Sequence, residues 1–134
     1  MYLENSNDKS PMETGINKKY RYDLETWSRL LDYFQQENVH FKNQLSFVIK
    51  NDKGNESLDK AEYFQNKFLN KDTVIVLLRQ DIGELMRYMD KGVYNDGKLD
   101  TFMKKHKRLS EDVEKLVQEF KRIKAEFSDY VAIN

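Results

Sequence analysis

The strongest constraint on the fold of this chain is the spacing of its apolar residues, which recur at alternating intervals of three and four positions. Such intervals average close to the 3.6 residues of one α-helical turn, so the side chains share one stripe along a helix. The longest stripe consists of Leu99, Phe102, His106, Leu109, Val113, Leu116, Phe120, Ile123, Phe127 and Tyr130. A stripe of this kind has to be buried against other helices, which predicts a helical bundle.

Two earlier segments carry the same pattern. The first contains Leu24, Trp27, Leu31, Phe34, Asn38, Phe41, Leu45 and Val48. The second contains Ala61, Phe64, Phe68, Lys71, Ile75, Leu78, Ile82, Leu85 and Met89. Between the stripes, residues 51–55 and 92–97 gather the Gly, Asn and Asp residues that end one helix and begin the next. The chain is therefore predicted to form three helices of about 30 to 36 residues each.

Three helices of similar length joined by short turns favour an all-α, antiparallel up-down-up bundle with coiled-coil-like packing. Two places leave an alternative of four shorter helices, because Asp72 with Thr73, and the residues 110–112, resemble helix starts. The apolar run at residues 74–78 also leaves a buried β-strand as an alternative for that segment.

The amino-terminal segment differs from the rest of the chain. Residues 1–19 are polar with few apolar anchors, so we expect a flexible tail, followed by one helical domain over residues 20–134. Asp23 is suited to cap the first helix while Tyr22 packs on Trp27 as a hydrophobic staple.

Composition narrows the function classes. The chain has 134 residues, with 23 basic and 23 acidic side chains, so net charge does not favour nucleic acid or an anionic membrane as partner. It has no cysteine, which excludes disulfides and thiolate chemistry. No apolar run is long enough to cross a bilayer, and the first 19 residues do not resemble a signal peptide. We expect a cytoplasmic protein that has no membrane partner.

Apolar residues outside the main stripes predict an interface. A second stripe on the first helix contains Leu30, Tyr33, His40 and Phe47, interleaved with Glu37 and Gln44. In the second helix Val74, Val76 and Leu77 extend the apolar surface beyond a single stripe, which one bundle cannot cover. Both features predict self-association, most simply as a two-fold homodimer, or contact with another protein.

Polar residues at core positions are predicted to have structural roles. Asn38 and Lys71 fall at similar heights in adjacent helices and are expected to form a polar layer that fixes register. His106, a third polar member of the core, is expected near Trp27 as a hydrogen-bonded structural histidine.

Motifs for chemistry are sparse. Glu37 and His40 form E-x-x-H, a spacing that resembles the metal motif of ferritin-like bundles, but the second copy that such a site needs is missing. The basic run from Lys104 to Arg108 alternates with acidic residues farther along the helix. We therefore predict a non-enzymatic interaction protein without a cofactor, with a metal-binding bundle, an enzyme or a weak nucleic-acid binder as alternatives.

Overall fold

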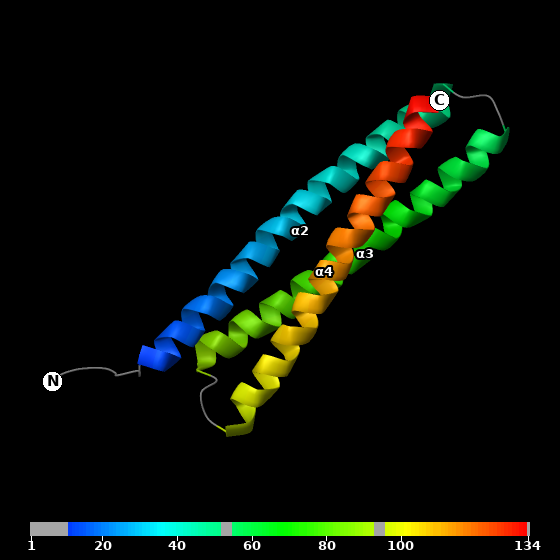
Figure 1. The fold of residues 1–134 in the computed structure, drawn as a ribbon. Coiled ribbons are helices and arrows are strands. Elements are labelled where there is room, and N and C mark those ends of the chain that lie inside the picture. Colours follow the sequence, from blue (N-terminus) through cyan, green and yellow to red (C-terminus); the bar gives the residue numbers. More distant parts are fainter. Residues whose placement is uncertain (1–10, 52–54, 93–95, 134) are drawn as a thin grey trace.

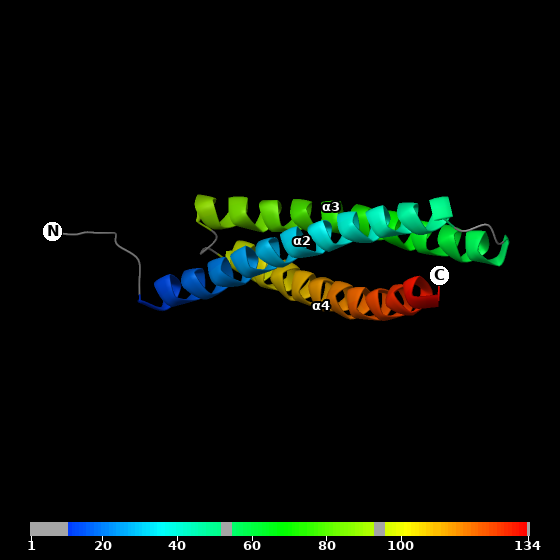
Figure 2. The ribbon, with the colours of Figure 1, turned by 90° about the horizontal axis from the view of Figure 1, so that it is seen from above.

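The structure, a computed structural model, describes residues 11–51, 55–92 and 96–133. These residues form three α-helices, which are α2 (Pro11–Asn51), α3 (Asn55–Lys91) and α4 (Asp96–Ile133). There is no β-strand in these ranges. The helices lie side by side, with α2 and α4 running in one direction and α3 in the other (Figure 1 and Figure 2). The predicted all-α, up-down-up bundle of three long helices is therefore confirmed.

Helices α3 and α4 are continuous at the two places where the sequence left a helix break as an alternative. Asp72 and Thr73 lie inside α3, and residues 110–112 lie inside α4. The Thr73 hydroxyl donates a hydrogen bond to the Leu69 carbonyl, 3.3 Å away and one turn earlier. Because the hydroxyl is satisfied within α3, it does not cap a new helix. The four-helix alternative is therefore wrong.

The first helix begins earlier than the sequence predicted. It starts at Pro11, because proline suits the first turn of a helix, where its missing N–H group is not needed. Asp23 lies well inside α2, and Tyr22 is largely exposed, so the predicted cap and staple are wrong. Residues 11–19 of the predicted tail are helical, whereas residues 1–10 lie outside the described residues.

The core is built from the three predicted stripes. Every side chain that the structure shows to be buried belongs to one of them. Trp27, Leu99 and His106 are the stripe members that are only half-buried. Residues 74–78 supply Ile75 and Leu78 to the core from within α3, so the strand considered for this segment is wrong.

Aromatic rings set the relative heights of the helices. Phe34 of α2 stacks on Phe120 of α4, with ring centroids 4.4 Å apart and ring planes 9° apart. Phe41 stacks on Phe68 of α3 at 5.4 Å, and Phe127 of α4 meets Phe68 edge-on at 5.1 Å. Rings of this size dominate core packing, so sliding one helix along the others would separate several ring pairs at once.

The described helix ends show how the chain reverses. Gly92 follows α3 with a φ of 77°, and its N–H group donates a hydrogen bond of 3.2 Å to the Met89 carbonyl. A residue with a side chain rarely adopts this left-handed conformation, which explains glycine at this position. At the end of α2, Asn51 Nδ2 donates to the Phe47 carbonyl at 2.8 Å. The predicted reversals also include residues 52–54 and 93–95, which lie outside the described residues.

Candidate functional site

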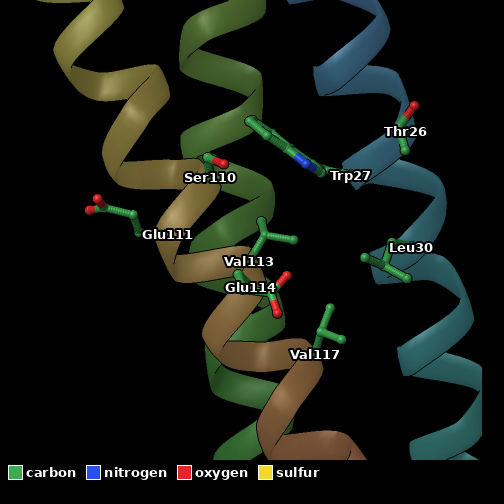
Figure 3. A pocket seen from close by; sticks show the side chains of 8 residues that line it. All are labelled: Thr26, Trp27, Leu30, Ser110, Glu111, Val113, Glu114 and Val117. Atoms are coloured by element: carbon green, nitrogen blue, oxygen red, sulfur yellow. The ribbon is translucent and has the colours of Figure 1, made fainter.

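A groove lies between α2 and α4, the helix pair with the least extensive contact in the bundle. It has a volume of about 570 Å³ and is lined by Thr26, Trp27, Leu30, Ser110, Glu111, Val113, Glu114 and Val117. Figure 3 shows Trp27 and Leu30 of α2 across the gap from Val113 and Val117 of α4. We refer to these four side chains as the groove floor. The floor is apolar, and the polar lining residues lie at its edges.

On the α4 side, the side chains that face the groove are shorter than the Phe120 ring farther along the helix. Where Phe34 and Phe120 stack, two rings fill the space between α2 and α4. Val113 and Val117 end at their γ-carbons, so they do not span the same gap. Their spacing of four residues places both on one side of α4.

A polar contact between α2 and α4 lies beside the groove. His106 Nε2 lies 2.9 Å from Asp23 Oδ2, and both side chains are largely buried. The imidazole also packs against the rings of Tyr20 and Trp27, at centroid distances of 4.6 and 5.0 Å. His106 is therefore held on the bundle by hydrogen bonding and ring contacts beside the groove floor.

Beyond the stacked Phe34 and Phe120 rings, an ion pair joins α2 and α4. Lys124 Nζ of α4 lies 3.2 Å from Glu37 Oε1 of α2. The hydrogen bond to Glu37 raises the pKa of the Lys124 ammonium, and the carboxylate charge acts in the same direction.

The α4 rim of the groove is acidic. Glu111 and Glu114 are exposed there, and Gln118 Nε2 donates to Glu114 Oε2 at 2.7 Å. On the α2 rim, Arg29 donates to the Thr26 hydroxyl at 3.4 Å. A ligand on the floor would thus meet apolar carbon in the middle and charged groups at the edges.

The predicted interface residues of α2 extend from the groove along the helix. Leu30 lines the groove and is half-buried, whereas Tyr33 and Phe47 are 50% and 68% exposed. His40 is also exposed. The stripe therefore continues past the Glu37–Lys124 pair as an uncovered aromatic surface on the described part of the chain.

The predicted interface residues of α3 separate into two places. Val74 and Leu77 line a smaller groove of about 260 Å³ between α3 and α4, and Val76 is exposed outside it. This second groove carries carboxylates: burial raises the pKa of Asp81, and the nearby Asp112 carboxylate raises it further.

Asn38 and Lys71 are both buried, at one level of the bundle. Asn38 Nδ2 donates to the Phe68 carbonyl at 2.8 Å and to Asp72 Oδ1 at 2.6 Å. Asp72 Oδ2 also accepts a hydrogen bond from Lys42 Nζ at 2.6 Å. Asn38 Oδ1 is buried without a hydrogen-bond partner among the described residues. The group ties α2 to α3 through Asn38, which belongs to the stripe of α2, and through Asp72 and Lys42, which flank the stripes.

Lys71 faces α4 from the same level. Its Nζ donates to Glu119 Oε1 at 2.6 Å. This hydrogen bond lowers the pKa of the Glu119 carboxyl below its usual range, against the opposing effect of burial. Lys71 therefore pairs its charge across the α3–α4 contact.

Sequence reasoning found the polar core residues and missed their partners. Asp23 and Asp72 resemble helix caps in the sequence, and no motif in the sequence marks Glu119. Their positions beside the apolar stripes are a partial indication of these contacts, because residues that flank a stripe can reach the neighbouring helix. Which residues meet across helices depends on register, and one helix alone does not reveal it.

Residues of the E-x-x-H motif and of the basic run form hydrogen bonds and ion pairs within the bundle. Glu37 of the E-x-x-H motif accepts a hydrogen bond from Lys124, and the described residues hold no group of three metal-ligating side chains. In the basic run, Lys104 pairs with Asp100 at 3.2 Å and Lys105 with Glu84 at 3.0 Å. Members of both motifs thus have their charges paired by neighbouring side chains.

Comparison of the chain with protein-family models, with curated proteins and with solved structures found no match. None of the helices in the described ranges combines the length and the apolar character that spanning a membrane requires. The fold and the groove therefore define the chain as a three-helix bundle protein with a partly open α2–α4 contact.

Proposed function

We propose that the protein is a helix-mediated interaction module that associates with itself, with a homodimer as the smallest assembly. The observation that carries this proposal is the stripe of Leu30, Tyr33 and Phe47, which runs from the groove onto the exposed face of α2. Exposed aromatic side chains next to an apolar groove favour association, because burying them removes apolar surface from water.

The apolar residues of α3 support a second contact surface on the same module. Leu77 and Val76 are each 53% exposed, and Val74 lines the smaller groove with Leu77. A partner protein bound there would meet the carboxylates of Asp81 and Asp112 beside the apolar side chains. Because Lys115 lines the same groove, this surface suits a helix that carries apolar residues flanked by both basic and acidic side chains.

The metal-binding and nucleic-acid alternatives remain testable beside this proposal. The Glu37–Lys124 and Lys105–Glu84 ion pairs favour a structural role for both motifs. Metal analysis of the purified protein tests the first alternative, and a salt-dependent shift of labelled DNA or RNA tests the second.

The proposed self-association is tested by sedimentation velocity over about 1 to 100 µM protein. We expect the mass to rise toward that of two chains as concentration increases. Phe47→Ser should shift this transition to higher concentration, while Leu69→Ser, which removes an exposed apolar residue of α3, should leave it unchanged. A wild-type chain that stays monomeric over the whole range would contradict the proposal.

A further inference from the structure

The stripe on α2 is complementary to itself when two copies of the helix run antiparallel. Its members, taken with the interleaved polar residues, are Leu30, Tyr33, Glu37, His40, Gln44 and Phe47. They alternate at three and four positions, the spacing with which one helix packs along another. Antiparallel pairing about the centre of the stripe places Leu30 opposite Phe47, Tyr33 opposite Gln44 and Glu37 opposite His40.

The two side chains of each facing pair are chemically complementary. Leu30 and Phe47 are both apolar, and Phe47 is the more exposed of the two. The Tyr33 hydroxyl and the Gln44 amide can exchange a hydrogen bond. Glu37 is a carboxylate, which accepts from more than one donor and can therefore bind His40 of the second copy as well as Lys124. A two-fold axis repeats every pair, so each favourable contact forms twice.

The same pairing fills the groove. Because Leu30 lines the groove, the side chain opposite it comes to lie beside the groove floor. That side chain is Phe47 of the second copy, and its ring is large enough to fill space that Val113 and Val117 leave open. Resting on the proposed self-association, we infer that the occupant of the α2–α4 groove is Phe47 of a second copy, with the two α2 helices antiparallel and Glu37 facing His40.

The register can be tested by disulfide cross-linking, because the chain has no cysteine of its own. In Tyr33→Cys/Gln44→Cys the two introduced thiols of one copy face those of the other. Within one helix these positions are about 16 Å apart, too far for an intramolecular disulfide, which needs Cα atoms within about 7 Å. We expect the oxidised double variant to run as a covalent dimer on a non-reducing gel.

The single variants Tyr33→Cys and Gln44→Cys are the matched controls. In the inferred register each thiol lies about 16 Å from its own counterpart, so little covalent dimer should form. Leu69→Cys, on the exposed surface of α3, measures cross-linking by random collision. Circular dichroism of all variants checks that the helices remain folded.

The outcomes separate the register from self-association itself. Efficient cross-linking of Tyr33→Cys alone would indicate parallel pairing and overturn the inference. A wild-type dimer in which the double variant cross-links no better than Leu69→Cys would also overturn the inference and leave the proposed function standing. A wild-type monomer overturns both. In the inferred dimer Phe47→Ala should weaken association by at least about 30-fold, the loss typical of a buried aromatic anchor.

Discussion

The polar residues of the core have unequal consequences for stability. Asn38 is fully buried and uses its amide N–H groups, yet its Oδ1 has no partner among the described residues. An unsatisfied buried acceptor costs about 1 to 3 kcal/mol. The two groups that accept hydrogen bonds from Asn38 depend less on these bonds. The Asp72 carboxylate also binds Lys42, and the Phe68 carbonyl lies within a continuous helix. Asn38 therefore contributes to register more than to stability.

We expect Asn38→Leu to raise the free energy of unfolding by about 1 kcal/mol, because leucine has a similar size and leaves no polar atom unsatisfied. Urea denaturation measures the effect as a higher midpoint. Gln36→Leu, at an exposed position of α2, should change stability by less than about 0.5 kcal/mol. A lower midpoint for Asn38→Leu would show that its hydrogen bonds outweigh the unsatisfied oxygen. In the same variant we expect looser control of oligomeric state, which light scattering detects.

The Lys71–Glu119 pair makes stability depend on pH. The hydrogen bond from Lys71 lowers the pKa of Glu119 in the folded chain. A carboxyl with a lowered folded pKa stabilises the fold above its unfolded pKa, and this contribution is lost as pH falls through the folded value. Wild-type stability should therefore fall on acidification through the range below the ordinary pKa of glutamate.

Replacing Glu119 by glutamine tests this dependence. Glu119→Gln should cost about 1 to 2 kcal/mol at pH 7, since it leaves the buried Lys71 ammonium without its carboxylate. The difference from wild type should shrink as pH falls below about 4. Denaturation series between about pH 7 and pH 3 measure it, with Glu62→Gln on the exposed face of α3 as control. A stability difference between Glu119→Gln and wild type that does not change with pH would show that the Lys71–Glu119 pair is not the source of the pH dependence.

At the scale of elements, the two glycines near the end of α3 differ in what they require. Gly92 follows α3 with a φ of 77°, and a Cβ there would meet no atom within 4 Å. Gly83 lies within α3, where a Cβ would make an ordinary contact of 3.6 Å with Arg87. Conformation alone therefore decides the outcome of adding a methyl group at each position.

The same substitution should have opposite signs at the two sites. Gly92→Ala should destabilise the fold by about 1 kcal/mol, because alanine is strained at positive φ. Gly83→Ala should stabilise it by about 0.5 to 1 kcal/mol through a better helix propensity. Thermal unfolding followed by circular dichroism compares them directly. Two shifts of the same sign would contradict the assignment of Gly92 as the helix stop.

The elements that the sequence predicts well are those set by local pattern. Alternation of three and four residues defines a helix face whatever its neighbours are, so Phe68 and Leu116 are assigned to the core directly. The polar composition of residues 1–19 predicts a start of α2 that is too late, although Pro11 itself favours the first turn of a helix. The contact of His106 with Asp23 joins residues far apart in sequence, and such pairs follow only from the register between helices.

At the scale of the molecule, the three helix–helix contacts differ in how extensively the two helices pack. The α2–α3 contact carries Arg79–Asp32 and Lys42–Asp72 ion pairs along its edge, and its helices pack most extensively. The α2–α4 contact is the least extensive and contains the groove. A three-helix bundle that is closed on one side and open on another has a preferred face for a further helix, which is the physical basis of the proposed dimer.

Trp27 provides a direct readout of this face, because it is the only tryptophan of the chain and part of the groove floor. If Phe47 of a second copy fills the groove, the indole loses contact with water as the dimer forms. We expect acrylamide quenching of Trp27 fluorescence to decrease with rising protein concentration, in parallel with the sedimentation transition. Phe47→Ser should shift the decrease to higher concentration, and Leu69→Ser should leave it unchanged. A dimer that forms without any change in Trp27 quenching would place the second copy elsewhere, with the smaller groove of Val74 and Leu77 as the next surface to probe.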